Sequence, residues 1–298
     1  MLMSSRVLEH YPDLKKFLDV FSDFFVASFN VESIILYNGI TLNDFSPKYS
    51  DIDVIVVLRN SLWGKDYDAL EEILSKLTER SPYASKLDLL IAPRNIIENP
   101  RVNFFDIEGM KIEGQKQEII NHYPLNQVDS FMIRNHGIVL YGEDLRYLFP
   151  TPSFDCFWEQ FTTDLYNIEQ RTKRYPFQEF PASDKEVIDL FLYFPRMLYS
   201  LKERDVVAKF QSAYWFANEY SNDLSDFLLE LAFARKKGYS LSGIIDLAEK
   251  GAKLIAFAME TAFKLRNLRC PDFYSKIEKR DGKYYFTKMF IEVRNCSE

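Results

Sequence analysis

The chain has 298 residues, of which 47% are hydrophobic, and this is enough for two modest domains with packed cores. Its formal net charge of −7 argues against a protein that binds duplex DNA or RNA, because such proteins usually carry a basic face. The three cysteines lie far apart and form no Cys-x-x-Cys pair, which indicates reduced thiols. The sequence shows neither a signal-like segment nor an apolar run of about 18 residues. We therefore expect a cytoplasmic protein that does not enter a membrane.

The first half of the chain mixes helical and strand patterns. Residues 11–30 carry apolar side chains at helical spacing, and residues 66–80 return to that spacing. Short runs rich in β-branched residues and leucine predict strands at 32–37, 51–58 and 86–93. This mixture is typical of an α/β domain, which we place at residues 1–150.

The second half is helical. Beyond the proline-containing segment 149–153 the pattern changes, so we predict an all-α domain over residues 151–298. Its long helical patterns are 154–175, 184–204, 205–220 and 242–268. The tail differs, because Asp281-Gly282 between two alternating runs is typical of a β-hairpin within 276–293.

Three aspartates stand near the beginnings of apolar strand patterns. Asp51 and Asp53 are one residue apart, so in a strand they point to the same face, and Asp88 has a similar position in the next strand pattern. If the two strands are neighbours, the three carboxylates converge at one edge of the sheet. Carboxylate oxygens suit Mg²⁺, which is typically shared with the phosphates of a nucleotide. The alternative is that these are ordinary solvent-exposed aspartates of turns.

The segment LYNGITLNDFSPKYSDIDVIVVL, residues 36–58, resembles the first motif of the nucleotidyltransferase superfamily, which has the DNA polymerase β-like fold. Two further stretches are similar to the aminoglycoside adenylyltransferases of the streptomycin and spectinomycin type. They are NHGIVLYGEDL at 135–145 and PRMLYSLKERDVVAKFQSAYWFANEY at 195–220. In the second stretch Arg196 and Lys209 are 209 − 196 = 13 positions apart, as in that family. The resemblance covers roughly residues 30–240. It implies an α+β nucleotidyltransferase domain, with a mixed sheet and flanking helices, followed by an all-α domain.

The same resemblance implies an enzyme that transfers AMP from ATP to a hydroxyl of a small, aminoglycoside-like acceptor, with Mg²⁺ as cofactor. Asp51 and Asp53 would be metal ligands. Asp88 would be the third carboxylate, either as a further ligand or as the base that takes the proton from the attacking hydroxyl. The residues implied to bind the nucleotide are Asn38, Gly39, Thr41, Ser50 and Lys209. The residues implied to meet a cationic acceptor are Glu186 and, in neighbouring registers, Asp184 and Asp189.

The first motif departs from the family pattern at two positions. Asn38 and Gly39 stand where the family has glycine and then serine, and Asn43 stands at a later glycine. The family glycine lets the backbone approach the phosphates, and the serine hydroxyl binds a phosphate oxygen. Asparagine tolerates the left-handed backbone conformation better than most residues, so we expect the turn to persist. Thr41 is a candidate to supply the missing hydroxyl.

Two other functions stay open at the level of the sequence. A catalytically degenerate member would act as a regulator that binds a nucleotide or a protein partner. A nucleic-acid 3′-end transferase would share the first motif, but the acidic charge balance argues against nucleic acid as a partner. Because the three aspartates persist, we favour an active enzyme.

Overall fold

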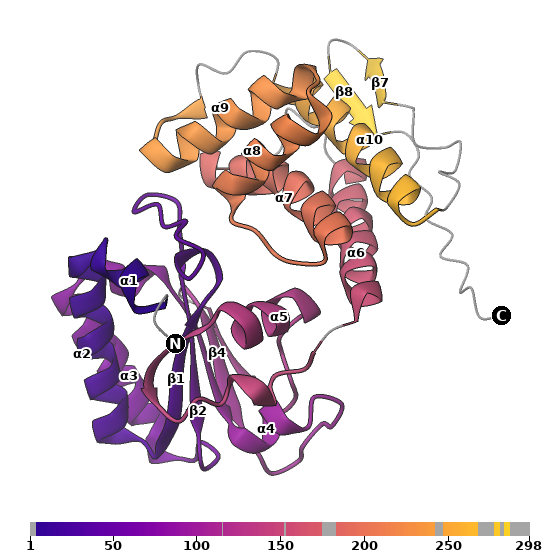
Figure 1. Cartoon of the computed structure of the whole chain (residues 1–298). Helices are drawn as coiled ribbons and strands as arrows, with labels where there is room; N and C mark the ends of the chain where they lie inside the picture. Colours follow the sequence, from indigo (N-terminus) through magenta and orange to yellow (C-terminus); the bar gives the residue numbers. More distant parts are fainter. Residues whose placement is uncertain are drawn as a thin grey trace. The chain divides into compact units, whose positions relative to one another are not determined.

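The computed structural model describes residues 4–114, 116–151, 153–174, 183–241, 247–267, 277–280 and 283–286. The chain forms two compact units, shown in Figure 1. The first unit comprises Met1–Phe45 and Ser50–Pro152. The second comprises Ser153–Glu298 together with the short segment Ser46–Tyr49.

A six-stranded mixed sheet forms the centre of the first unit, in the order β5-β4-β3-β2-β1-β6. Its strands are β1 Val31–Tyr37, β2 Ile52–Leu58, β3 Leu87–Pro93, β4 Gly109–Glu113, β5 Lys116–Ile120 and β6 Ile138–Gly142. Only β2 and β3 pair in parallel, and the other neighbours in this sheet are antiparallel. Parallel neighbours need a crossover connection, which here contains helix α3, Lys65–Arg80. The three strands predicted from the sequence are therefore β1, β2 and β3.

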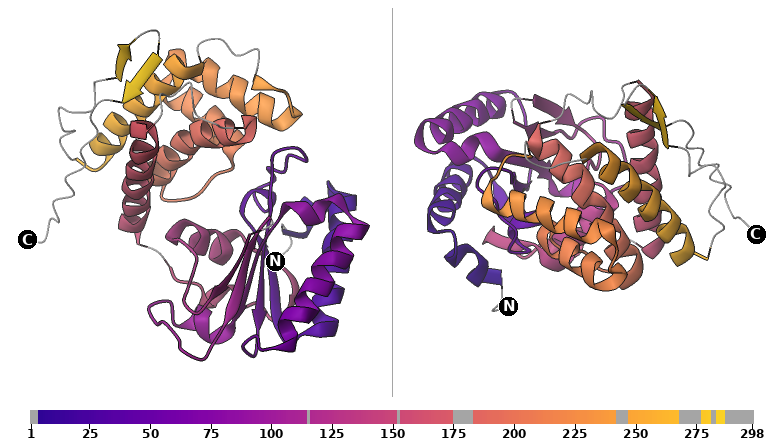
Figure 2. Two further views of the ribbon diagram at one scale, coloured as in Figure 1. Left: turned by 180° about the vertical axis from the view of Figure 1, so that it is seen from behind. Right: turned by 90° about the horizontal axis from the view of Figure 1, so that it is seen from above.

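Helices cover both faces of this sheet (Figures 1 and 2). Helices α2, Pro12–Ser28, and α3 lie on one face, with the short α1, Ser4–Glu9, next to α2 in the chain. Helices α4, Arg94–Glu98, and α5, Gln127–His136, lie on the other face. Because strands covered on both faces bury all their side chains, this arrangement explains why β2 is apolar beyond Asp53.

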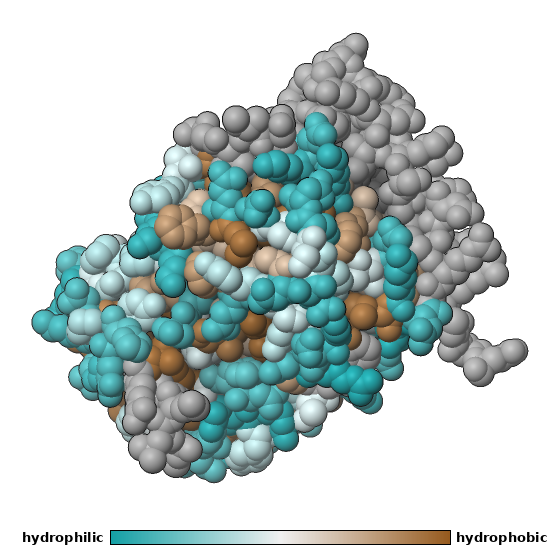
Figure 3. Space-filling view, turned by 45° about the horizontal axis from the view of Figure 1, so that its top comes forward, coloured by the Kyte–Doolittle hydropathy of each residue, from teal (hydrophilic) through white to brown (hydrophobic). Residues whose placement is uncertain are grey.

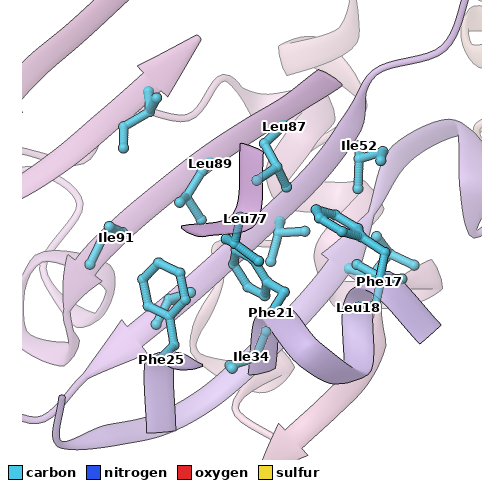
Figure 4. Close-up of a cluster of buried hydrophobic side chains, with 14 of the residues drawn as sticks. Phe17, Leu18, Phe21, Phe25, Ile34, Ile52, Leu77, Leu87, Leu89 and Ile91 are labelled. Carbon is cyan, nitrogen blue, oxygen red and sulfur yellow. The ribbon is translucent and has the colours of Figure 1, made fainter. Parts of the chain in front are cut away.

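The two cores divide the side chains of β2 as strand alternation predicts. Ile52, Val54, Val56 and Leu58 belong to the core beneath α2 and α3. Figure 4 shows phenylalanines of α2 and Leu77 of α3 against the strand residues of that core. Ile55 and Val57 point to the opposite face and pack in the core that includes Ile133 of α5. The same alternation therefore assigns Asp53 to the face covered by α5.

The second unit is helical, as expected, with a pair of short strands near the end of the chain. Its helices are α6 Phe154–Arg174, α7 Asp184–Glu203, α8 Lys209–Tyr220, α9 Asp223–Lys237 and α10 Leu247–Leu265. Helix α8 begins at Lys209 rather than at 205, and α9 was not among the predicted helices. Strands β7, Ile277–Arg280, and β8, Lys283–Phe286, pair antiparallel. The Asp-Gly predicted to connect them lies outside the described residues.

Segment Ser46–Tyr49 is bound to the end of α9 by side-chain hydrogen bonds. Ser46 Oγ, Lys48 Nζ and Tyr49 Oη donate to the carbonyl oxygens of Arg235, Gly238 and Tyr239, over 2.8, 3.0 and 2.6 Å respectively. These contacts explain why four residues of the loop before β2 belong to the helical unit.

The surface is mainly hydrophilic on the face in Figure 3, where hydrophobic residues form small groups among polar ones. Within the described ranges, no helix is both long and apolar enough to cross a bilayer.

Candidate active site

A row of polar side chains crosses the sheet at one end of the face covered by α5. Asp53 of β2 pairs with Asp88 of β3 in the parallel register, and Asp88 pairs in turn with Glu113 of β4. On the other side, Asp53 pairs with Tyr37, the last residue of β1. Residues paired across neighbouring strands point to the same face. The structure therefore brings together Asp53 and Asp88, as the sequence predicted, and adds Glu113 and Tyr37 to their row.

Asp51 has a different environment from the other two predicted carboxylates. It precedes β2 by one residue and is exposed, whereas Asp53 and Asp88 are half-buried within their strands. The predicted strand started at Asp51, but the observed one starts at Ile52. Asp51 is still close enough for its charge to raise the pKa of both Asp53 and Asp88.

Ionisation is costly for the two half-buried aspartates. Burial is the main reason that the pKa of Asp53 is raised to about 7, and the charges of Asp88, Asp129 and Asp51 add to it. A hydrogen bond from the side chain of Asn38 opposes this rise. Burial also raises the pKa of Asp88 to about 6, with a contribution from the charge of Glu113. A cation bound here would relieve both effects, because an opposite charge favours the ionised form.

Three charged residues of this row were missed by the sequence analysis. Lys111 and Glu113 of β4 form an ion pair, and the charge of Lys111 opposes the rise in the pKa of Asp88. Asp129 is the third residue of α5 and adds to the pKa of Asp53 and of Asp88. An alternating segment such as GMKIE signals a strand, but its register against Asp88 cannot be found from local sequence. Asp129, at the start of a helix, has the sequence signature of an ordinary first-turn acid.

The loop after β1 keeps the turn that the sequence predicted. Asn38 begins the 3₁₀ helix η1, Asn38–Ile40, and has a φ of +61°, and Asn43 has a φ of +59°. Both asparagines therefore adopt the left-handed conformation at positions where the family pattern has glycine, which confirms that expectation. The side-chain Nδ2 of Asn38 donates to Oδ1 of Asp53 over 3.1 Å. The departure from the family pattern thus adds a side chain that contacts a predicted catalytic residue.

The hydroxyls predicted to bind the nucleotide both donate to backbone oxygens of this loop. Thr41 Oγ1 donates to the carbonyl oxygen of Asn38 over 2.8 Å. Ser50 is buried, and its Oγ donates to the carbonyl oxygen of Asp44 over 3.4 Å. A hydroxyl that donates to a carbonyl can still accept a hydrogen bond. Gly39 has little free space, because a Cβ built on it would lie 3.3 Å from the carbonyl oxygen of Asp44.

Lys209, in the second unit, has a carboxylate partner. Its Nζ lies 2.5 Å from Oδ1 of Asp189 on α7. The buried Arg235 lies near the same carboxylate, with its Nε 3.8 Å from Oδ1. Burial lowers the pKa of Lys209, as do the charges of Arg235 and Arg196, whereas Asp189 opposes that decrease. Lys209 and Arg235 are therefore two cations that share the carboxylate of Asp189.

The other two predicted acceptor-binding residues have structural partners within the second unit. Glu186 is exposed and completes a capping box with Ser183 at the start of α7. Its Oε2 accepts from the backbone N–H of Ser183 over 2.8 Å. Asp184 Oδ2 accepts from the backbone N–H of Leu241 over 3.2 Å. A cap at a helix terminus is a sufficient reason for an acidic residue at this position.

Asp53 and Asp88 fit Mg²⁺ by the chemistry of their donors. Within the residues that the structure describes, no three His, Cys, Asp or Glu side chains form a group ready to hold a metal ion. Mg²⁺, however, is commonly bound by one or two carboxylates together with the phosphates of the substrate, rather than by a complete protein cage. Two paired aspartates at a sheet edge, each with a raised pKa, match that kind of site.

Comparison with known proteins supports the fold. No protein-family model and no curated protein matches the sequence. Among solved structures, the chain is similar to the spectinomycin adenyltransferase AAD(9) from Enterococcus faecialis, whose crystal structure was determined with ATP and spectinomycin. The two are 13% identical with a TM-score of 0.55, and the match covers 84% of this chain and 98% of that one. The likeness shows that the two proteins share a fold, which in this chain is a mixed α/β first unit followed by a helical region.

Proposed function

We propose that the protein is a nucleotidyltransferase that transfers AMP from ATP to a hydroxyl of a small, aminoglycoside-like molecule. The observation that carries this proposal is the pairing of Asp53 with Asp88 on adjacent parallel strands, in a fold shared with an adenyltransferase. That neighbour was crystallised with ATP and a small acceptor, which favours the same kinds of ligand here. A cytoplasmic location would supply the ATP.

In this proposal Asp53 and Asp51 hold Mg²⁺ together with phosphate oxygens. Bound Mg²⁺ would neutralise the charge that develops on the triphosphate during transfer. Asp53 would supply a ligand from within β2, and the exposed Asp51, which directly precedes β2, would supply a second one. Asp88 belongs to the same group of carboxylates, as a further ligand or as the base.

Asp88 is the proposed general base. The acceptor oxygen attacks the α-phosphorus, the bond from that phosphorus to the pyrophosphate oxygen breaks, and the hydroxyl proton passes to Asp88. Burial and the charge of Glu113 both raise the pKa of Asp88, and a raised pKa makes a carboxylate a better proton acceptor. The negative charges of Glu113 and Asp129 near this edge would also favour a cationic acceptor.

The nucleotide is proposed to contact Gly39, Thr41, Ser50 and Lys209. Two cations, Lys209 and Arg235, lie near Asp189, and a phosphate group would be a further anionic partner for Lys209. Asn38 belongs to the same loop, but its side chain already donates to Asp53. Glu186, Asp184 and Asp189 stay proposals for acceptor binding, and each also has a partner within the second unit.

The experiment is AMP transfer from ATP to spectinomycin or streptomycin in Mg²⁺, followed by mass spectrometry of the acceptor and by pyrophosphate release. Asp88→Asn is expected to slow transfer about 100-fold or more, because a general base contributes at least that much. Glu71→Gln is the matched control, since Glu71 is an exposed carboxylate on α3. ATP binding without transfer to any hydroxyl acceptor would overturn the proposal and favour a regulatory nucleotide-binding protein.

A further inference from the structure

Asn38 has an uncommon combination of backbone strain and a specific side-chain contact. Its φ of +61° lies in the left-handed region, which asparagine tolerates better than most residues but which is still less favourable for it than for glycine. Its carbonyl oxygen accepts from the backbone N–H of Thr41 over 3.0 Å and from Thr41 Oγ1 over 2.8 Å. Strained residues that their surroundings hold firmly are concentrated at functional sites.

The contact of Asn38 with Asp53 follows from the end of β1. Tyr37, the last residue of β1, pairs with Asp53, so Asn38 leaves the strand directly beside that aspartate. In the left-handed conformation its Nδ2 lies 3.1 Å from Oδ1 of Asp53. Asn43 has nearly the same φ, +59°, and also stands at a glycine of the family pattern. The two asparagines therefore have the same backbone strain, and Asn38 has in addition the contact with Asp53.

A side-chain amide that donates to one oxygen of a carboxylate restricts the rotation of that carboxylate. The other oxygen is then left for a cation, and the donor acts as an outer-shell partner of the ligand. Outer-shell partners orient metal ligands, and their removal weakens metal binding. A glycine at position 38 would allow the same turn, but it would leave Oδ1 of Asp53 without this donor.

We propose that Asn38 is a positioning residue for Asp53, holding Oδ1 so that Oδ2 faces the divalent cation, in place of the nucleotide contact predicted for Asn38 itself. This inference rests on the proposed function, in which Asp53 is a ligand of Mg²⁺. It assigns Asn38 a role through Asp53 rather than through the nucleotide. Asparagine in place of the family glycine at position 38 then changes how the carboxylate of Asp53 is oriented.

The test compares Asn38→Gly with the matched control Asn43→Gly in the full-length protein. Both substitutions relieve a left-handed asparagine, so both variants are expected to fold and to melt near the wild-type temperature. Binding of Mn²⁺ alone is measured by the loss of the free-ion electron paramagnetic resonance signal. Asn38→Gly is expected to weaken Mn²⁺ binding about tenfold, and Asn43→Gly is expected to leave it unchanged. Equal Mn²⁺ affinities for wild type and Asn38→Gly, or equal losses in both variants, would overturn the inference.

The Mn²⁺ measurement is independent of turnover. Weaker Mn²⁺ binding in Asn38→Gly, in a protein that transfers no AMP, would support the positioning role and contradict the proposed function. Unchanged Mn²⁺ binding in Asn38→Gly, in a protein that does transfer AMP, would contradict the positioning role and support the proposed function. A wild-type protein that binds no Mn²⁺ would also overturn the positioning role.

Discussion

Asp53 and Asp88 are the carboxylates at this sheet edge whose ionisation is disfavoured by their surroundings. They are paired on adjacent strands, half-buried, and close to the charges of Glu113 and Asp129. Side chains held in this way are protonated more readily than ordinary aspartates until a cation binds. Their arrangement is therefore unfavourable for the stability of the metal-free protein and useful for holding a cation and accepting a proton.

The pKa values of these two aspartates predict how stability depends on pH. Both pKa values are higher in the folded protein, at about 7 and about 6, than in the unfolded chain. The folded state therefore binds more protons than the unfolded state between about pH 4 and pH 7. This contribution to the free energy of unfolding is complete below about pH 4 and is lost as the pH rises to about 7, by an amount on the order of several kcal/mol. Urea unfolding in a chelator at pH 5 and at pH 7.5 measures it.

The comparison variant for this prediction is Asp53→Asn. Of the two aspartates, Asp53 has the larger rise in pKa, and the substitution removes its ionisable carboxyl group. The difference in stability between this variant and wild type should grow in favour of the variant from pH 5 to pH 7.5. A difference that does not change with pH would mean that Asp53 ionises as in the unfolded chain.

Gly39 offers a direct test of the departure from the family pattern. Gly39→Ser restores the family hydroxyl, and its Cβ would lie 3.3 Å from the carbonyl oxygen of Asp44, a tight contact that needs only a small shift. We expect a stability cost of about 1 kcal/mol or less and a gain in ATP affinity of about tenfold or more, since a hydrogen bond to a charged group contributes about 1.5–3 kcal/mol. Isothermal titration calorimetry with ATP measures the affinity.

Gly39→Ala separates the hydroxyl from the Cβ. It introduces the same contact with Asp44 but no donor, so it should lose stability like Gly39→Ser without a gain in ATP affinity. If serine and alanine had the same effect on ATP binding, the loop would not contact the phosphates at this position.

The capping box at the start of α7 gives Glu186 a structural role. Glu186 was predicted to meet the acceptor, but it accepts a hydrogen bond from the backbone N–H of Ser183 and so stabilises the start of the helix. Glutamine is also found at this position of capping boxes. Glu186→Gln should therefore keep the cap, whereas Glu186→Ala should lower stability by about 1 kcal/mol.

The same pair of variants tests the proposed contact of Glu186 with a cationic acceptor. If that contact exists, Glu186→Gln should raise the KM for the acceptor while the melting temperature stays near that of wild type. An unchanged KM in Glu186→Gln, with a lower melting temperature in Glu186→Ala, would leave Glu186 with the capping role alone.

Elements with strong local patterns could be predicted from the sequence, and those defined by distant partners could not. The apolar spacing of α2 and the uniform run of β2 identified both elements. Helix α9 was missed although Asn222 caps its beginning and Gly238 its end, so attention to helix caps would have found it. The order of strands β4 and β5, and hence the position of Glu113, depends on sheet pairing between residues far apart in sequence.

At the scale of the whole molecule, the resemblance in two short stretches predicted the order of the two units. The structure has a mixed sheet with helices on both faces, followed by a helical region, and it is similar to a solved adenyltransferase. The sequence also predicted that Asp53 and Asp88 share one sheet edge if their strands are neighbours, and the pairing of β2 with β3 in the structure meets that condition. The contact of Asn38 with Asp53 needed the observed φ of Asn38. The net charge of −7 agrees with the proposed cationic acceptor, because opposite charges speed the association of a protein with its ligand.

The central claim is that a divalent cation and ATP bind at the edge formed by Asp53 and Asp88. A crystal of the full-length protein soaked with Mn²⁺ and α,β-methylene-ATP, which cannot transfer AMP, tests this claim most directly through the anomalous scattering of manganese. The account predicts an anomalous peak in contact with a carboxylate oxygen of Asp53 and with phosphate oxygens. A nucleotide-bound manganese ion away from Asp51, Asp53 and Asp88 would contradict it.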